Sequence, residues 1–172
     1  MSEKSNIGVE IERKYIIKMP DNEALCSAES YSSSEILQIY LPSSDGETHR
    51  IRRRVFADRV ECTKTRKIRI DKMSSTEIES EISESSFYAL AKNPLPGYTP
   101  IEKVRHTFIY NGQLFEIDVY PQWSNSAIME TELPSRETQV EFPSFVEIIR
   151  EVTGDKNYSN AGMSKSFPPE GL

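Results

Sequence analysis

The chain of 172 residues is poor in the residues that several common kinds of functional site require. It has two cysteines, two histidines and seven glycines. Cys26 and Cys62 are too few for a disulfide framework and form no CxxC pair, and neither His49 nor His106 has a partner at zinc-ligand spacing. The glycines form no phosphate-binding loop of the P-loop or Rossmann type, and there is no GxSxG nucleophile elbow. These absences argue against structural zinc, loop-based nucleotide binding and the α/β-hydrolase mechanism.

Long apolar runs are also missing. No stretch approaches the ~20 apolar residues that a membrane helix needs, and residues 1–8 lack the apolar core of a secretory signal. We therefore expect a soluble protein of the reducing cytoplasm, with no membrane as a partner. The net charge of −6 and the lack of interleaved aromatic residues also disfavour nucleic acid, although a local basic cluster can still bind a compact anion.

What the sequence has instead is charge at every second position in seven short segments. Side chains alternate between the two faces of a β-strand, so Glu10, Glu12 and Lys14 share one face while Ile11 and Tyr15 share the other. The spacing recurs in Arg50, Arg52 and Arg54; Lys64 and Arg66; Glu79 and Glu81; Lys103 and Arg105; Glu116 and Asp118; and Glu130 and Glu132. For any one segment, a solvated strand face with weak ion pairs is the simpler interpretation. Seven such segments in one chain favour a shared, wet interior.

The pattern of apolar and turn-forming residues predicts a single domain with eight strands and three short helices. The strands are expected at 9–17, 35–41, 48–56, 60–70, 76–82, 100–110, 113–120 and 127–133. Asn111-Gly112 is typical of a tight hairpin turn. The helices are expected near 20–29, 84–92 and 144–153. The last has a possible capping box in Ser144 and Glu147, an apolar stripe, and Gly154 at its end.

An even number of mainly antiparallel strands can close into a barrel, which removes exposed strand edges. We therefore predict a mainly β (α+β) fold, in which an eight-stranded antiparallel β-barrel forms a charged tunnel and short helices pack outside. In such a barrel the apolar faces look outward and the charged faces meet in the tunnel, where water and ions compensate them.

The inward charges predict two kinds of binding. Arginine presents a planar fork of donors that matches phosphate oxygens, and lysine adds a point charge. The basic residues that suit a polyphosphate are Arg50, Arg52, Lys64, Lys103 and Arg105. Paired carboxylates are hard oxygen ligands for Mg²⁺ or Mn²⁺, which keep several waters and bind substrate phosphates. The clearest pairs are Glu10 with Glu12 and Glu130 with Glu132.

These motifs, in this order, resemble those of the CYTH superfamily, the triphosphate tunnel metalloenzymes. The segment from Glu10 to Lys14 is similar to the ExExK signature that opens the family. Further similar segments cover nearly the whole chain: Arg50 to Arg52, Thr63-Lys64, Glu79 to Glu81, Glu102 to Arg105, Phe115 to Asp118, Glu130 to Pro134, and Glu151 to Lys165. The chain departs from the family pattern in the additional charges of Arg54, Arg66 and Glu77. The strand ending Cys62-Thr63-Lys64-Thr65 also differs from the family's usual one.

The resemblance implies one CYTH-like domain over residues 1–172, similar to compact bacterial inorganic triphosphatases. The implied activity is metal-dependent hydrolysis of tripolyphosphate to pyrophosphate and phosphate, with nucleoside triphosphates as candidate further substrates and Mg²⁺ or Mn²⁺ as cofactor. The alternatives are a class IV adenylate cyclase, a thiamine triphosphatase, and a non-catalytic module that binds polyphosphate or nucleotide. The partner is thus a small-molecule triphosphate, and the oligomeric state stays open, with a homodimer among the options.

The resemblance also assigns candidate roles. The candidate catalytic residues are Lys14, Glu116 and Asp118. The candidate substrate ligands share a positive charge and are Lys14, Arg50, Arg52, Lys64, Lys103, Arg105 and Lys165. The candidate metal ligands are the carboxylates of Glu10, Glu12, Glu79, Glu81, Asp118, Glu130 and Glu132.

Overall fold

A computed structural model describes residues 5–170. The described part leaves out residues 1–4 and 171–172. Residues 1–4 belong to the segment that was expected to lack a secretory signal. The strands are β1 (Ser5–Lys18), β2 (Glu29–Leu41), β3 (Glu47–Val55), β4 (Val60–Arg69), β5 (Ser74–Glu81), β6 (Ile101–Tyr110), β7 (Gln113–Val119), β8 (Ser126–Glu132) and β9 (Ile148–Glu151). The helices are α1 (Asn22–Cys26), α2 (Glu84–Leu90), the 3₁₀ helix η1 (Lys156–Tyr158) and α3 (Asn160–Lys165). None of these helices is long and apolar enough to cross a bilayer.

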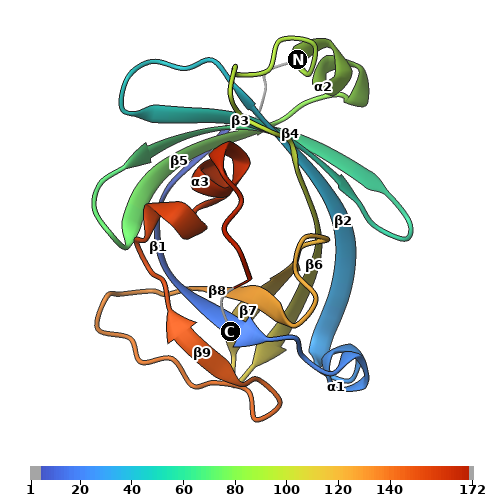
Figure 1. Cartoon of the computed structure of the whole chain (residues 1–172), viewed down its shortest axis with the longest axis vertical. Helices are drawn as coiled ribbons and strands as arrows, with labels where there is room; N and C mark the ends of the chain where they lie inside the picture. The colour runs from blue at the N-terminus through green and yellow to red at the C-terminus, as the bar shows by residue number, and fades with distance from the viewer. Residues whose placement is uncertain (1–4, 171–172) are drawn as a thin grey trace.

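Eight of the strands close into an antiparallel ring in the order β1-β5-β4-β3-β2-β6-β7-β8, with β8 next to β1 again (Figure 1). The long strand β1 closes the ring because its two halves have different partners. Its first half, Ser5–Ile11, pairs with β5, and its second half, Glu12–Lys18, pairs with β8. β9 then pairs with β1 beyond the point where β5 has ended. The predicted mainly β, eight-stranded barrel is confirmed.

The predicted helix over 144–153 is wrong, whereas the other two predicted helices correspond to α1 and α2. Most of its apolar stripe instead lies in and around β9, which extends the sheet beside β1, and Val152 N donates to Lys14 O at 2.8 Å. β-branched residues suit a strand. β1 supplies the hydrogen-bond partners that the backbone N–H and C=O groups of this segment would otherwise find within a helix. Gly154 lies in the turn after β9 with a φ of 77°, a conformation that glycine adopts without strain.

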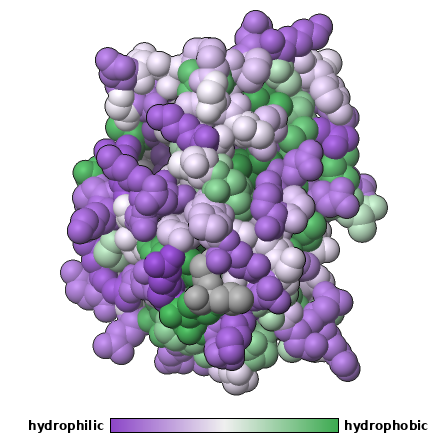
Figure 2. Space-filling model, in the orientation of Figure 1, coloured by the Kyte–Doolittle hydropathy of each residue, from purple (hydrophilic) through white to green (hydrophobic). Residues whose placement is uncertain are grey.

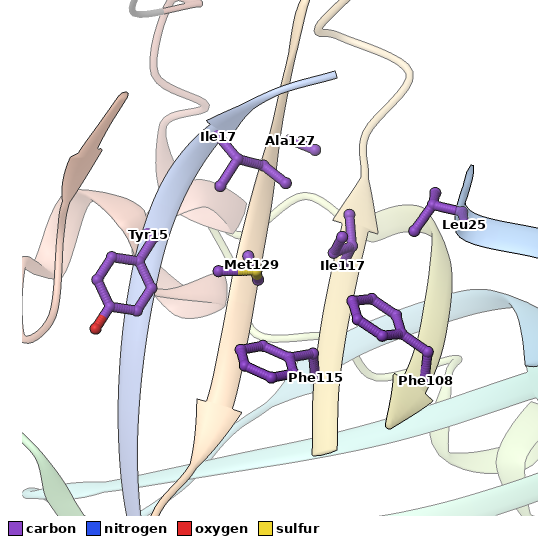
Figure 3. Close-up of a cluster of buried hydrophobic side chains, with 8 residues drawn as sticks. All are labelled: Tyr15, Ile17, Leu25, Phe108, Phe115, Ile117, Ala127 and Met129. Carbon is purple, nitrogen blue, oxygen red and sulfur yellow. The ribbon is translucent and has the colours of Figure 1, made fainter. Parts of the chain in front are cut away.

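A large apolar cluster packs on the outer face of the barrel. Its eight buried residues come from β1, β6, β7, β8 and α1 and are Tyr15, Ile17, Leu25, Phe108, Phe115, Ile117, Ala127 and Met129 (Figure 3). The chain between β8 and β9 covers the cluster with Val140, Phe145 and Val146. A smaller cluster packs under α2, where Phe87 meets residues of β2, β3 and β4. The apolar faces of these strands therefore look outward, as the alternation predicts.

A third apolar cluster departs from that prediction because it fills one part of the barrel interior. Ile16 and Ile128 are paired across β1 and β8 and lie on the same face as the charged pair Lys14 and Glu130. They pack against the C-terminal segment, the part of the chain that follows β9. The eight buried residues of this cluster are Ile16, Ile101, Tyr120, Trp123, Ile128, Val152, Tyr158 and Met163. In Figure 1 this red segment, with α3, projects across the opening of the ring. The charged interior thus occupies the remaining part of the barrel.

Candidate active site

The inward faces of the strands enclose a cavity of about 800 Å³. Each strand contributes alternate residues to it, so the register decides which charged side chains reach the interior. The face of the molecule that looks along the ring is mainly hydrophilic, with smaller hydrophobic patches (Figure 2). The cavity brings together most of the predicted residues: Glu10, Glu12, Lys14, Arg50, Arg52, Glu79, Arg105, Glu116, Glu130 and Glu132.

Opposite charges concentrate on opposite sides of this cavity. One side, the basic wall, consists of Arg50, Arg52 and Arg54 on β3. The strand across the ring, β8, is separated from β3 by three strands in either direction. The acidic wall consists of carboxylates on β8 and its neighbours β1 and β7, namely Glu10, Glu12, Glu116, Glu130 and Glu132. Such a cavity attracts an anion to one side and a cation to the other.

Arg52, in the middle of the basic wall, has no carboxylate partner among the described residues. Its Nε and Nη2 atoms donate to Gln38 Oε1 at 3.4 and 3.3 Å, and Gln38 Nε2 donates to Tyr40 Oη at 2.9 Å. Burial, together with the positive charges of Arg50 and Arg105, lowers the pKa of Arg52 to about 10. An anion in the cavity would relieve this electrostatic stress.

The two neighbouring arginines are also incompletely neutralised. Arg50 has a carboxylate 3.6 Å away, that of Glu77, but its buried Nε atom makes no hydrogen bond within the described part of the chain. Arg54 donates from Nε to the hydroxyl of Ser34 at 2.7 Å, and burial lowers its pKa. The basic wall therefore has donors to spare for a ligand.

Arg105, in contrast, is held by carboxylates. Its Nε and Nη2 atoms donate to the two oxygens of Asp118 at 2.7 Å each, and it also pairs with Glu116 and Glu130. Lys103 Nζ donates to Asp118 Oδ2 at 2.5 Å, and burial lowers the pKa of this lysine to about 8. The side chains of Lys103 and Asp118 are both 0 % exposed, and neither residue lines the cavity. The structure thus places both residues behind the cavity lining, whereas the sequence predicted contacts of Lys103 with substrate and of Asp118 with metal or water.

The register of β4 places Lys67, and not Lys64, inside the barrel. Arg50 on β3 is paired with Thr65, so the inward face of β4 contains Thr65 and Lys67 while Lys64 faces outward. Lys67 Nζ lies 2.7 Å from Glu77 Oε1 on the adjacent strand. The predicted substrate ligand Lys64 therefore lies on the outward face. β4 carries lysine and arginine on both faces, so the alternation alone does not show which face is inward.

Two further predicted residues lie away from the cavity. Lys165, the last residue of α3, is exposed, and its Nζ atom lies 5.6 Å from the centre of the Tyr98 ring. Glu81, at the end of β5, shares a face with Glu79 but is exposed and does not line the cavity. The C-terminal segment instead presents Lys156 to the cavity, a residue that lies in the family-like segment Glu151 to Lys165 but was not among the predicted ligands.

The C-terminal segment is anchored against the interior by close packing. Ser159 caps the N-terminus of α3, and its Oγ atom accepts from Gly162 N at 3.0 Å. A Cβ atom at Gly162 would lie 1.9 Å from Lys156 O, so this approach requires glycine. Asn160 lines the cavity, and its Oδ1 atom accepts from Lys103 at 3.3 Å. The segment thus forms part of the site.

Glutamates of the acidic wall lie directly opposite one another on neighbouring strands. Glu12 lies opposite Glu132 on β1 and β8, and Glu116 lies opposite Glu130 on β7 and β8. Burial, together with neighbouring carboxylates, Glu77 foremost, raises the pKa of Glu10 to about 8. Burial likewise raises the pKa of Glu132, with Glu116 and Glu12 contributing. Carboxylates that repel one another in this way favour a compensating cation.

These donors fit a hard divalent cation. No three of the histidine, cysteine, aspartate and glutamate side chains in residues 5–170 are already arranged around one metal position. Mg²⁺ does not require such a cage, because it keeps several waters and is usually bound by one or two carboxylates together with substrate phosphates. Glu10, Glu12 and Glu132 are the side chains best placed for this, since they face the cavity and lack a cation of their own at hydrogen-bonding distance within the described chain.

No family model and no curated protein matches the chain. Among solved structures, the inorganic triphosphatase NE1496 is 28% identical, with a TM-score of 0.59 over 94% of this chain and 97% of that chain. Another structure of NE1496, described as a hypothetical protein, is 28% identical with a TM-score of 0.57 over 92% and 99%. The PH1819 protein of Pyrococcus horikoshii OT3, 22% identical with a TM-score of 0.52 over 74% and 80%, shares the fold. The ordered charge motifs, the closed antiparallel barrel and the likeness to NE1496 over nearly the whole chain are consistent with the CYTH superfamily.

Proposed function

We propose that this protein is a metal-dependent hydrolase of inorganic triphosphate that releases pyrophosphate and phosphate. The observation that carries the proposal is Arg52, a partly buried guanidinium in the cavity whose partner is a neutral amide and which is flanked by Arg50 and Arg54. A charge that is partly withdrawn from water and has no counterion is costly, so this arrangement suits a site that is filled by an anionic ligand. The name of NE1496 as an inorganic triphosphatase supports a bare triphosphate as that ligand.

The chain's own residues suit the two tasks of phosphoryl transfer. Guanidinium groups of the basic wall match phosphate oxygens, and Lys14, Lys67 and Arg105 place further positive charge in the same cavity. As negative charge spreads over the transferred phosphoryl group, fixed cations stabilise it without reorganising. Mg²⁺ or Mn²⁺, held by Glu10, Glu12 and Glu132, would neutralise phosphate charge and polarise a water molecule. Glu116 lines the cavity and is our candidate for orienting that water.

The test compares two adjacent arginines of β3. Arg52 faces the cavity, whereas Arg53 faces outward and its Nη2 atom lies 2.7 Å from Glu84 of α2. With tripolyphosphate and Mg²⁺ or Mn²⁺, the variant Arg52→Gln should lose about 100-fold or more in kcat/KM. Arg53→Gln should stay within about twofold of the parent, because an exposed ion pair contributes little. Failure of the parent protein to hydrolyse tripolyphosphate with either metal would refute the proposal.

Parallel incubations separate the alternatives. Nucleoside triphosphates are proposed as further substrates, cleaved less efficiently because the cavity offers charged contacts for phosphate. Cyclic AMP from ATP would instead identify a cyclase, faster cleavage of thiamine triphosphate a thiamine triphosphatase, and binding without turnover a non-catalytic module. We retain the cytoplasm as the proposed location, since Cys26 and Cys62 are both free.

A further inference from the structure

Strand β2 lies between the basic wall on β3 and Arg105 on β6, and its inward polar side chains carry no charge. Gln38 is paired with Arg52, and Tyr40 is paired with Arg50. The side chains of Gln38 and Tyr40 are buried, with 0 % of Gln38 and 4 % of Tyr40 exposed. Arginines of β3 thus meet neutral acceptors on β2, whereas Arg105, on the other side of β2, meets carboxylates.

Gln38 is fixed at both ends of its amide group. Its Oε1 atom accepts two hydrogen bonds from Arg52, and its Nε2 atom donates to Tyr40 Oη at 2.9 Å. A guanidinium has donors and no acceptor, so the oxygen of Gln38 must face Arg52 and the nitrogen must face Tyr40. Burial raises the pKa of Tyr40, so its hydroxyl stays neutral and this end of the network carries no charge.

Arg105, which is buried, and Arg52, which is partly buried, show how the choice of partner changes the pKa of an inward-facing arginine. Arg105, held by Asp118, has a pKa raised well above its ordinary value by the neighbouring carboxylates, despite the opposing effect of burial. Arg52, held by Gln38, has a lowered pKa, because burial and two nearby arginines act on it without a counterion. Arg105 already has its counterions, and Arg52 still requires one.

We propose that Gln38 is a positioning residue that orients the Arg52 guanidinium in the cavity without neutralising it, so that a phosphate group of the substrate becomes the counterion of Arg52. The proposal rests on the proposed function and names a residue that determines how strongly the site binds a polyanion. A carboxylate at position 38 would satisfy Arg52 from within the protein and compete with the substrate, as Asp118 does for Arg105.

Two substitutions at position 38 separate charge from shape. Gln38→Glu keeps an acceptor for Arg52 but adds a negative charge, whereas Gln38→Met keeps a similar volume but removes both hydrogen bonds. Tripolyphosphate binding is measured by calorimetry in the presence of a chelator, so that no turnover occurs, and melting temperature is measured in parallel. We expect Gln38→Glu to weaken binding at least about tenfold at a nearly unchanged melting temperature. Gln38→Met should melt at a lower temperature yet bind more tightly than Gln38→Glu, because Arg52 keeps its charge.

A merely structural role for Gln38 would give the reverse order, with the weakest binding in Gln38→Met. That order, or binding by a folded Gln38→Glu within about twofold of the parent, would overturn the proposal. Gln122→Glu is the matched control, because it adds the same charge at an exposed position outside the cavity and should leave binding unchanged. If Gln38→Glu does not fold, Gln38→Met must still bind more tightly than Arg52→Met, and equal losses would overturn the proposal. A parent protein that binds tripolyphosphate but does not hydrolyse it contradicts the proposed hydrolase alone.

Discussion

Arg105 and Asp118 face each other across β6 and β7 and are joined by two parallel hydrogen bonds of 2.7 Å. Asp118 is completely buried and also accepts from Lys103, so cations surround both of its oxygens. Arg105 lines the cavity, whereas Asp118 and Lys103 do not. Asp118 therefore acts on the site through Arg105, by holding the guanidinium in a fixed orientation.

Replacement of Asp118 by asparagine should destabilise the fold strongly. The change leaves Lys103 and Arg105 with uncompensated buried charge, and removing one partner of a buried ion pair costs about 3–5 kcal/mol. Urea denaturation measures this loss. Asp45→Asn, in an exposed turn, is the control and should change the free energy of unfolding by less than about 0.5 kcal/mol. Equal effects of the two substitutions would show that the Asp118 pair is not structurally important.

The two lysines of β4 should differ sharply in their effect on activity. Lys67 lines the cavity beside Glu77, while Lys64 faces outward on the same strand. Lys67→Gln should lower kcat/KM for tripolyphosphate by about tenfold to 100-fold, because it removes a cation from the phosphate site. Lys64→Gln should leave kcat/KM within about twofold. A larger loss for Lys64→Gln would mean that the face of β4 that binds substrate is the opposite one.

The stability of the metal-free protein should fall as pH rises from about 4.5 to about 8. Glu10 retains its proton in the folded state up to a pKa of about 8, which burial and neighbouring carboxylates raise from the ordinary value of 4.5. The unfolded chain loses this proton near the ordinary pKa, so the stability present at lower pH is lost as pH rises through the folded pKa. Glu10→Gln cannot ionise and should therefore melt at a higher temperature than the parent above pH 8 in a chelator. At pH 4.5 the two proteins should melt alike, and equal melting temperatures at both pH values would contradict the assignment.

Metal dependence should be located in the acidic wall. A chelator should abolish turnover and Mg²⁺ or Mn²⁺ should restore it, because the crowded carboxylates require a cation. Glu12→Gln should lower turnover by orders of magnitude with an unchanged far-UV circular dichroism spectrum. Glu81→Gln is the matched control, since Glu81 lies outside the cavity, and it should retain nearly full turnover. Near-normal turnover in Glu12→Gln would remove Glu12 from the site.

The strand period was enough to predict the barrel and part of its interior. Arg50 and Arg52 alternate with Ile51, which is fully buried, so the two faces of β3 differ in character and the inward set is readable. β4 offers no such contrast, because Lys64 and Lys67 lie on opposite faces of a strand that is charged on both. Only pairing with β3 determines which of them is inward, and pairing is a property of the tertiary structure.

The C-terminal part of the chain could not be predicted for a similar reason. The apolar residues around β9 fit a helical spacing, and the choice of a strand depends on the free backbone groups that β1 offers beside it. The sequence did not predict the apolar part of the interior, because Ile16 and its two neighbours Tyr15 and Ile17 are all apolar or aromatic, and all three are buried. Where both faces of a strand are apolar, alternation does not distinguish inside from outside.

The division of β1 between two partners also constrains how the chain folds. Paired residues of β1 and β5 are separated by about two fifths of the chain's length, whereas β8, which closes the ring, begins only at Ser126. Five strands can therefore curl into an open sheet long before the remaining three complete it. Contacts between such distant residues make folding slow, on the order of milliseconds to seconds. Until closure, the second half of β1 presents an unpaired edge that can pair with another chain, so this protein should refold most efficiently at low concentration.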